Sequence, residues 1–310
     1  MTDSARLFVI ATRYGLIEHA RNRFAMLLVV VFVPMLVTLV RVAVTDIQLP
    51  FRLRDTGLVL LANGNKLAQI SAALMAVSLI TGFMMFAATF GSGEFDRRLS
   101  MAGFPRVALG LAKVACLMVA SVAVSAYATV IICGYWSPRQ PLVLAAALFC
   151  AAMTYGALGV ALGTLLRREV EGMFALAMIS AVDMAVQNPI ASNGADTDIV
   201  RWLPSYGAMQ AATAAGFSDA TLFKDFAVQL TWFTASALVG LIVFHRRTRS
   251  TLGPTMRIGR SRPRLPGTDP AGRDGHALTV SHAISRVVGM NTSRPAVVDA
   301  VDDDDAYPSP

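Results

Sequence analysis

Charged residues are scarce in this sequence. Only 15% of its 310 residues are charged, whereas 55% are hydrophobic and the mean hydropathy is +0.56. An ordinary soluble domain has about 25% charged residues, so this composition excludes one. Most of the chain must therefore lie in lipid.

Groups that carry chemistry inside a membrane are also few. The four histidines lie outside the long apolar runs, at His19, His245, His276 and His282, and Asp183 is the one acid well inside a run. No carboxylate pair for acid–base catalysis and no metal-binding histidine set is available there. A Gly-x-x-x-x-Gly-Lys-Ser/Thr phosphate loop is also missing from the sequence. We therefore expect a chain that is not an enzyme, has no cofactor of its own and has no nucleic-acid partner.

Cysteine is nearly absent. The three cysteines, Cys116, Cys133 and Cys150, all fall within apolar runs. A small polarisable side chain packs well inside a membrane helix, so these residues predict neither a disulfide framework nor a metal site.

Long apolar runs dominate what is present. About 20 apolar residues are needed to cross a bilayer as a helix. Continuous runs, without the alternation of a barrel strand, favour an all-α, polytopic membrane fold. The sequence predicts six spans near 24–44, 67–90, 108–133, 142–166, 173–186 and 226–244. The fifth is short and ends at Gln187-Asn188-Pro189, so we expect neighbouring helices to shelter it.

Basic residues set the expected orientation, because the cytoplasmic side of a membrane protein carries more Lys and Arg. An even number of spans places both termini on one side. That side has thirteen flanking cations: Arg6, Arg13, Arg21, Arg23, Arg97, Arg98, Arg106, Lys113, Arg167, Arg168, Arg246, Arg247 and Arg249. The other side has seven: Arg41, Arg52, Arg54, Lys66, Arg139, Arg201 and Lys224. We therefore predict that both termini are cytoplasmic.

The two ends of the chain differ in composition from the spans. Residues 1–23 carry apolar side chains at helical spacing and end in arginines, which predicts either an interfacial helix on the inner leaflet or a cytoplasmic lead-in helix. Residues 24–249 form the transmembrane domain. Residues 250–310 are rich in Arg, Pro and Gly and then in Asp, which predicts a disordered cytoplasmic tail.

Two features inside the spans are notable, and the first has competing interpretations. Asp183, with Gln187 and Asn188, gives the fifth span a polar face. Ionisable groups in a membrane often line a substrate path, but a hydrogen bond between helices, or hydration near the outer interface, explains the same residues. In the fourth span, Gly156, Gly159 and Gly163 have the small-residue spacing that allows close helix packing.

The segment between the second and third spans is the most informative. Ser92 can cap a helix whose first turn holds Glu94 and Asp96. Gly103 and Pro105 then end it. The sequence therefore predicts a short amphipathic cytoplasmic helix, in which Phe95, Leu99 and Ala102 share an apolar face and Arg97 and Arg98 lie beside it.

This pattern resembles the coupling-helix region of the ABC type-2 transporter permeases. The helix is followed by Gly103-x-Pro105-Arg106 and by Gly110-x-x-Lys113 at the entry of the third span. The charged N-terminal helix, the six spans, the external segment with Trp202-Leu203-Pro204 and the Arg246-Arg247 exit are similar to that family too. The resemblance covers about residues 5–249. Phe95 departs from the pattern, since many members have a charge or a Gly-Thr-Leu run there.

The resemblance implies a permease subunit of an ATP-binding-cassette exporter in the plasma membrane. Its partners would be an ATP-binding subunit, which holds ATP and Mg²⁺, and a second permease copy or paralogue. The coupling residues would be Glu94, Phe95, Asp96, Arg97, Arg98, Leu99 and Ala102. The cargo would be a drug, lipid, natural product or glycan. The alternative is a six-helix membrane scaffold or membrane enzyme without transport.

Overall fold

The structure is a computed structural model that describes residues 3–53, 57–187, 198–220 and 223–249. These residues all belong to one compact unit, Met1–Thr255. The predicted tail, residues 250–310, and Asn188 lie outside the described residues.

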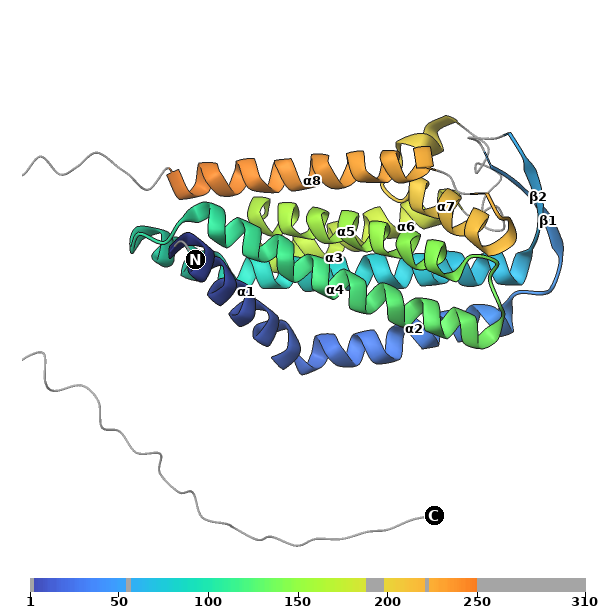
Figure 1. Ribbon diagram of the computed structural model, residues 1–310, viewed down its shortest axis with the longest axis horizontal. Helices are drawn as coiled ribbons and strands as arrows, with labels where there is room; N and C mark the ends of the chain where they lie inside the picture. Colours follow the sequence, from blue (N-terminus) through green and yellow to red (C-terminus); the bar gives the residue numbers. More distant parts are fainter. Residues whose placement is uncertain (1–2, 54–56, 188–197, 221–222, 250–310) are drawn as a thin grey trace, which may run out of the picture. The chain divides into compact units, whose positions relative to one another are not determined.

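Helices make up nearly all of the described chain (Figure 1). Five of them are long and apolar enough to cross a membrane. These are α2 (Arg23–Ala43), α3 (Gly64–Met101), α4 (Arg106–Tyr135), α5 (Pro141–Leu165) and α8 (Phe223–Arg249). The predicted fifth span is a helix as well, α6 (Glu169–Gln187), but it is not among the five candidates. The architecture is that of a polytopic helical membrane protein, and six spans remain a prediction.

Helix α1 (Asp3–Arg21) precedes the first candidate span, as the sequence predicts. It packs on α4. The two helices approach so closely that a Cβ atom on Gly15 would lie 2.8 Å from Sγ of Cys116. Asn22 then separates α1 from α2, and its side chain accepts a hydrogen bond from Ala25 N at 3.1 Å.

The centre of the unit is formed by α3 and α5, while α2 and α8 lie at its periphery (Figure 1). Glycines explain the close contact between α3 and α5. A Cβ on Gly159 would lie 2.2 Å from the carbonyl oxygen of Gly82, and one on Gly163 would lie 3.0 Å from that of Phe86. The predicted packing role of these glycines is confirmed. All three cysteines are free.

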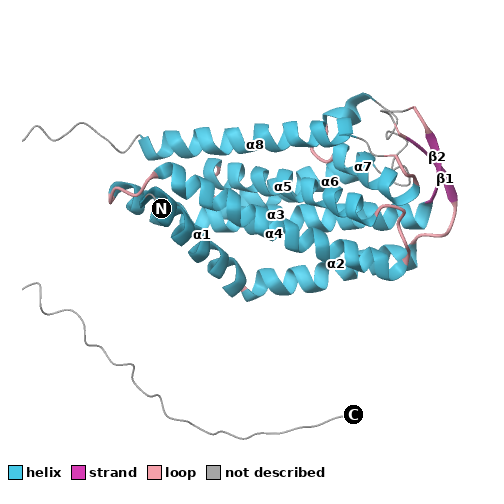
Figure 2. Ribbon diagram, viewed as in Figure 1, coloured by secondary structure: helices cyan, strands magenta, loops and turns pink. Residues whose placement is uncertain are grey.

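The loop between α2 and α3 holds the exception to an all-α fold. Strands β1 (Gln48–Arg52) and β2 (Val59–Asn63) pair antiparallel, with Gln48 opposite Asn63 and Arg52 opposite Val59. Figure 2 shows this hairpin at the opposite end of the helices from α1. Strands this short give little sequence signal, because only Phe51 and Ala62 within them are buried.

A second unpredicted element lies at the same end. The segment predicted as an external loop contains a 3₁₀ turn, η2 (Asp198–Trp202), and the 12-residue helix α7 (Tyr206–Phe217). Helix α7 is almost entirely buried among α3, α5 and α8. At about 1.5 Å per residue it is too short to span a bilayer. The end with the hairpin and α7 is called the hairpin end below, and the end with α1 and the α3–α4 turn is called the α1 end.

Candidate functional site

The predicted coupling residues lie on the last turns of α3. The prediction of a separate short helix capped by Ser92 is wrong, because α3 is continuous from Gly64 to Met101. Gly91 and Gly93 each reduce the stability of this helix by only about 1 kcal/mol relative to alanine, so they do not interrupt it. Ser92 is instead bonded within the helix, where its Oγ donates to Oδ2 of Asp96 at 3.1 Å. The predicted coupling residues therefore lie in the continuous end of a central helix, and residues 91–101 are called the α3 extension below.

The α3 extension ends where the sequence predicts, at Gly103 and Pro105. Gly103 adopts a left-handed conformation, with φ of 91°. The N–H of Phe104 donates to the carbonyl of Leu99 at 3.0 Å, and that of Gly103 to the carbonyl of Ser100 at 3.4 Å. This is the Schellman arrangement, which only glycine adopts without strain. Pro105 is the N-cap residue of α4, which begins at Arg106, so the turn between the two helices is short.

Asp96 has a different place from the one predicted. The sequence places it among the charges around an apolar docking face, but the side chain is only 7% exposed. Its Oδ2 lies 2.6 Å from Nζ of Lys113 in α4. Nζ also donates to Oγ of Ser92 at 2.8 Å. Asp96 therefore attaches the extension to α4 and is not available at an outer surface.

The other predicted coupling residues remain at the surface. The side chain of Phe95 is 63% exposed. Ala102 is also exposed, whereas Leu99 is half-buried. The charged residues Glu94, Arg97 and Arg98 are exposed. An exposed phenylalanine among exposed charges is a surface that a soluble partner can bind.

A cavity of about 390 Å³ lies between α1, the α3 extension and the start of α4. Its lining is mostly apolar, with Phe95, Leu99 and Phe104 on one side, and Glu18 and His19 contribute polar groups from α1. Burial lowers the pKa of His19, Glu18 opposes this change and Lys113 adds to it. His19 is therefore neutral near pH 7.

At the hairpin end, Asp183 is the centre of a buried hydrogen-bond network. The hydroxyl of Tyr155 donates to Oδ2 and the amide of Gln187 donates to Oδ1. The backbone N–H of Ser205 donates to Oδ2 at 3.0 Å. Gln187 also donates to Oγ of Ser205 at 2.9 Å. Of the three interpretations of Asp183, these contacts favour the hydrogen bond between helices, since they join α5, α6 and the start of α7.

Sequence analysis missed two members of this network. Tyr155 lies in an apolar run, and the available signal was that a buried tyrosine hydroxyl usually has a partner. Ser205 directly precedes α7, and serine at that position suggests a helix start. Neither signal identifies Asp183 as the partner, because the three residues come from separate segments.

A second buried network attaches α7 to α8. The amide of Gln229 donates to Oγ1 of Thr154 at 2.7 Å and to the carbonyl of Pro204 at 2.8 Å. Its Oε1 accepts from the N–H of Ala208 at 3.1 Å. The next residue back, Gly207, touches α8 so closely that a Cβ would lie 2.1 Å from the carbonyl oxygen of Asp225. Helix α7 is thus fixed on both sides by polar contacts.

The described residues contain no evident metal-binding site. No group of three or more His, Cys, Asp or Glu side chains there is arranged to hold a metal ion. The three polar clusters, around Asp96, Asp183 and Gln229, instead join helices to one another.

Comparison of the sequence with protein-family models gives no match, and comparison with curated proteins gives none either.

Proposed function

We propose that this chain is the permease subunit of an ATP-binding-cassette exporter, powered by a separate ATP-binding subunit. The supporting observation is the α3 extension. One helix runs 38 residues, from the hairpin end to the α3–α4 turn. That length is about 57 Å at 1.5 Å per residue, whereas the hydrocarbon core is about 30 Å thick. A helix of this length carries its last turns beyond the membrane.

The extension has the properties of a mechanical link. The Asp96–Lys113 ion pair holds it on α4, and the Schellman turn fixes its end. Phe95, Arg97 and Arg98 are exposed at that end, where Phe95 also lines the cavity beside α1. A partner that binds them and moves would displace α3 and α4 together, because packed helices move as rigid bodies.

The location and direction of transport follow from the same proposal. The excess of basic residues at the α1 end supports a cytoplasmic location for that end and for both termini. The membrane is the plasma membrane, and a second permease copy or a paralogue completes the transport path. The cargo is a drug, lipid, natural product or glycan, which the second half of the path would help to select.

Copurification tests this proposal. The tagged full-length chain is purified from the membranes of its own cells in mild detergent, and the associated proteins are identified. We expect a subunit with a Gly-x-x-x-x-Gly-Lys-Ser/Thr loop and ATP hydrolysis by the complex. A chain that purifies without any such subunit and transports nothing would support the scaffold alternative.

A further inference from the structure

A narrow slot lies between α4 and α8, apart from the networks around Asp183 and Gln229. Both helices pack on α5 but have little direct contact with each other. The slot has a volume of about 70 Å³, and its floor includes Ala157 and Val160 of α5. Val114 and Leu241, at its sides, are 37% and 53% exposed, so the slot opens sideways, where a bilayer would surround the helices.

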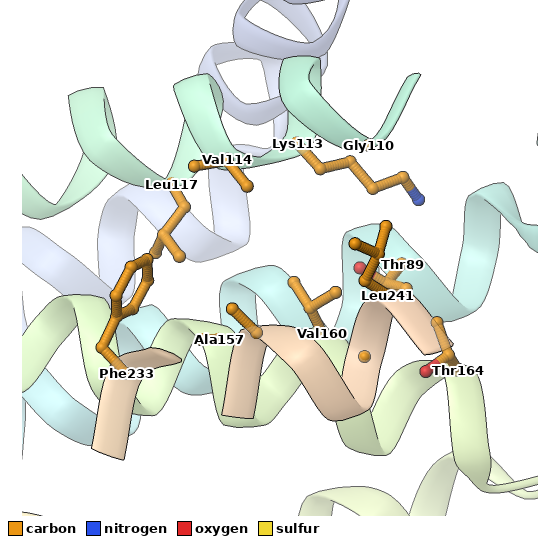
Figure 3. Close-up of a pocket in the computed structure, with 12 residues that line it drawn as sticks. Thr89, Gly110, Lys113, Val114, Leu117, Ala157, Val160, Thr164, Phe233 and Leu241 are labelled. Atoms are coloured by element: carbon orange, nitrogen blue, oxygen red, sulfur yellow. The ribbon is translucent and has the colours of Figure 1, made fainter. Parts of the chain in front are cut away.

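The slot is apolar along its length and polar at one end. Figure 3 shows Leu117, Ala157 and Phe233 toward one end, and the amine of Lys113 with the hydroxyl of Thr89 toward the other. The polar end is the α1 end, since Lys113 lies near the start of α4 and Leu241 near the end of α8. An amphiphile that fits this slot has a hydrocarbon chain and one polar group.

Lys113 has a donor to spare for that polar group. An ammonium group has three N–H donors. Asp96 and Ser92 take two of them, and the described part of the chain offers no further partner. The Lys113 side chain is 20% exposed and lines both the slot and the cavity beside α1, so an oxygen atom at the end of the slot can reach it.

The residues around this end favour a negative headgroup. Arg167 follows Thr164, which lines the slot, by three positions, and Arg246 follows Leu241 by five. Both arginines are exposed at or just beyond the ends of their helices. Basic side chains in this position attract anionic lipids by about 1 kcal/mol each. The Lys113–Asp96 ion pair adds no net charge, so the arginines supply the positive charge at this end.

We infer that the slot between α4 and α8 binds an anionic phospholipid, with one acyl chain along Leu117 and Phe233 and its phosphate at the free N–H of Lys113. The site concerns the membrane helices alone and does not depend on the transport function. Bound lipid would fill the gap between α4 and α8 and hold both helices on α5.

Photolabelling tests the site. The full-length protein is reconstituted in phosphatidylcholine vesicles that contain a little phosphatidylglycerol with a diazirine near the end of one acyl chain. We expect label to concentrate on the α4 and α8 peptides that contain Leu117 and Phe233. Unlabelled phosphatidylglycerol should compete about fivefold better than phosphatidylcholine, the factor that corresponds to about 1 kcal/mol. Equal competition by the two lipids would overturn the anionic assignment.

A pair of tryptophan variants separates the slot from the general lipid surface. Val114→Trp places a large side chain at the open side of the slot and should abolish the enriched labelling. Val122→Trp, on the same helix at a residue that is 54% exposed and does not line the slot, should leave it unchanged. The inference would be overturned if labelling at each position depended only on how exposed that position is. It would also be overturned if the enriched labelling persisted in Val114→Trp. The competition between lipids uses the unaltered protein and remains decisive if Val114→Trp does not fold.

Discussion

Nζ of Lys113 in α4 lies 2.6 Å from Oδ2 of Asp96 in the α3 extension, and Oγ of Ser92 contacts both side chains. This contact joins the two helices on either side of the α3–α4 turn. It also converts an acid of the predicted docking surface into an internal structural group. The proposed transmission of motion from a soluble partner into the membrane depends on this attachment.

Removal of either partner of the ion pair should destabilise the protein. Asp96→Asn or Lys113→Gln leaves an unpaired group in a buried site, and we expect a loss of about 1 to 3 kcal/mol for each. The double variant should lose less than the sum of the two, because it leaves no lone charge. Thermal unfolding of the purified chain and its three variants measures this difference. Strict additivity would mean that the two side chains do not interact.

The packing of α1 should weaken in acid. The pKa of His19 is lowered by burial, so the folded chain binds fewer protons at this group than the unfolded chain does. The stability contributed by neutral His19 is complete above the usual imidazole pKa of about 6.5 and is lost as the pH falls below it. Protease cleavage within α1 should therefore accelerate between pH 7.5 and pH 5. His19→Gln should remove this pH dependence, and an unchanged profile in that variant would assign it to another group.

Two glycine substitutions of opposite expected effect test the position of α7. Gly207→Ala introduces a Cβ that would meet the carbonyl oxygen of Asp225 at 2.1 Å, and it should destabilise the protein by about 1 to 3 kcal/mol. Gly134→Ala, in α4, meets no atom within 4 Å and should be neutral or stabilise by up to about 1 kcal/mol. Thermal unfolding midpoints give the comparison. Equal effects would show that α7 does not lie against α8 as described.

The Asp183 network should act on stability more than on transport. Tyr155→Phe removes one hydroxyl that donates to Asp183 and should cost about 1 to 2 kcal/mol. Asp183→Asn keeps the shape and one acceptor oxygen, so the Ser205 N–H retains a possible partner. Both variants should lower the unfolding temperature, and under the proposed export function the range of exported compounds should stay the same. A changed range at unchanged stability would restore the substrate-path interpretation of Asp183.

The sequence predicted the long helices because each contains a continuous apolar run of membrane length, and Gly103 with Pro105 marked the α3–α4 turn correctly. Helix α7 was missed, since its twelve residues are mostly Ala, Gly and Thr and fit neither a span nor an amphipathic pattern. The capping role predicted for Ser92 was wrong for a related reason. Its alternative partners, Asp96 and Lys113, include a residue 21 positions away that only tertiary structure brings close.

The central claim is that a separate ATPase binds the end of the α3 extension, and Phe95 tests it most directly. Phe95→Ala should weaken association with the copurified ATPase by about 1 to 3 kcal/mol, as for a buried interface anchor. The matched control is Phe223→Ala, at the hairpin end, where the side chain is 80% exposed. The measurement is the ATPase dissociation constant for the two variants, with membrane insertion confirmed for both. The account predicts a loss of affinity for Phe95→Ala alone, and unchanged affinity in that variant would contradict it.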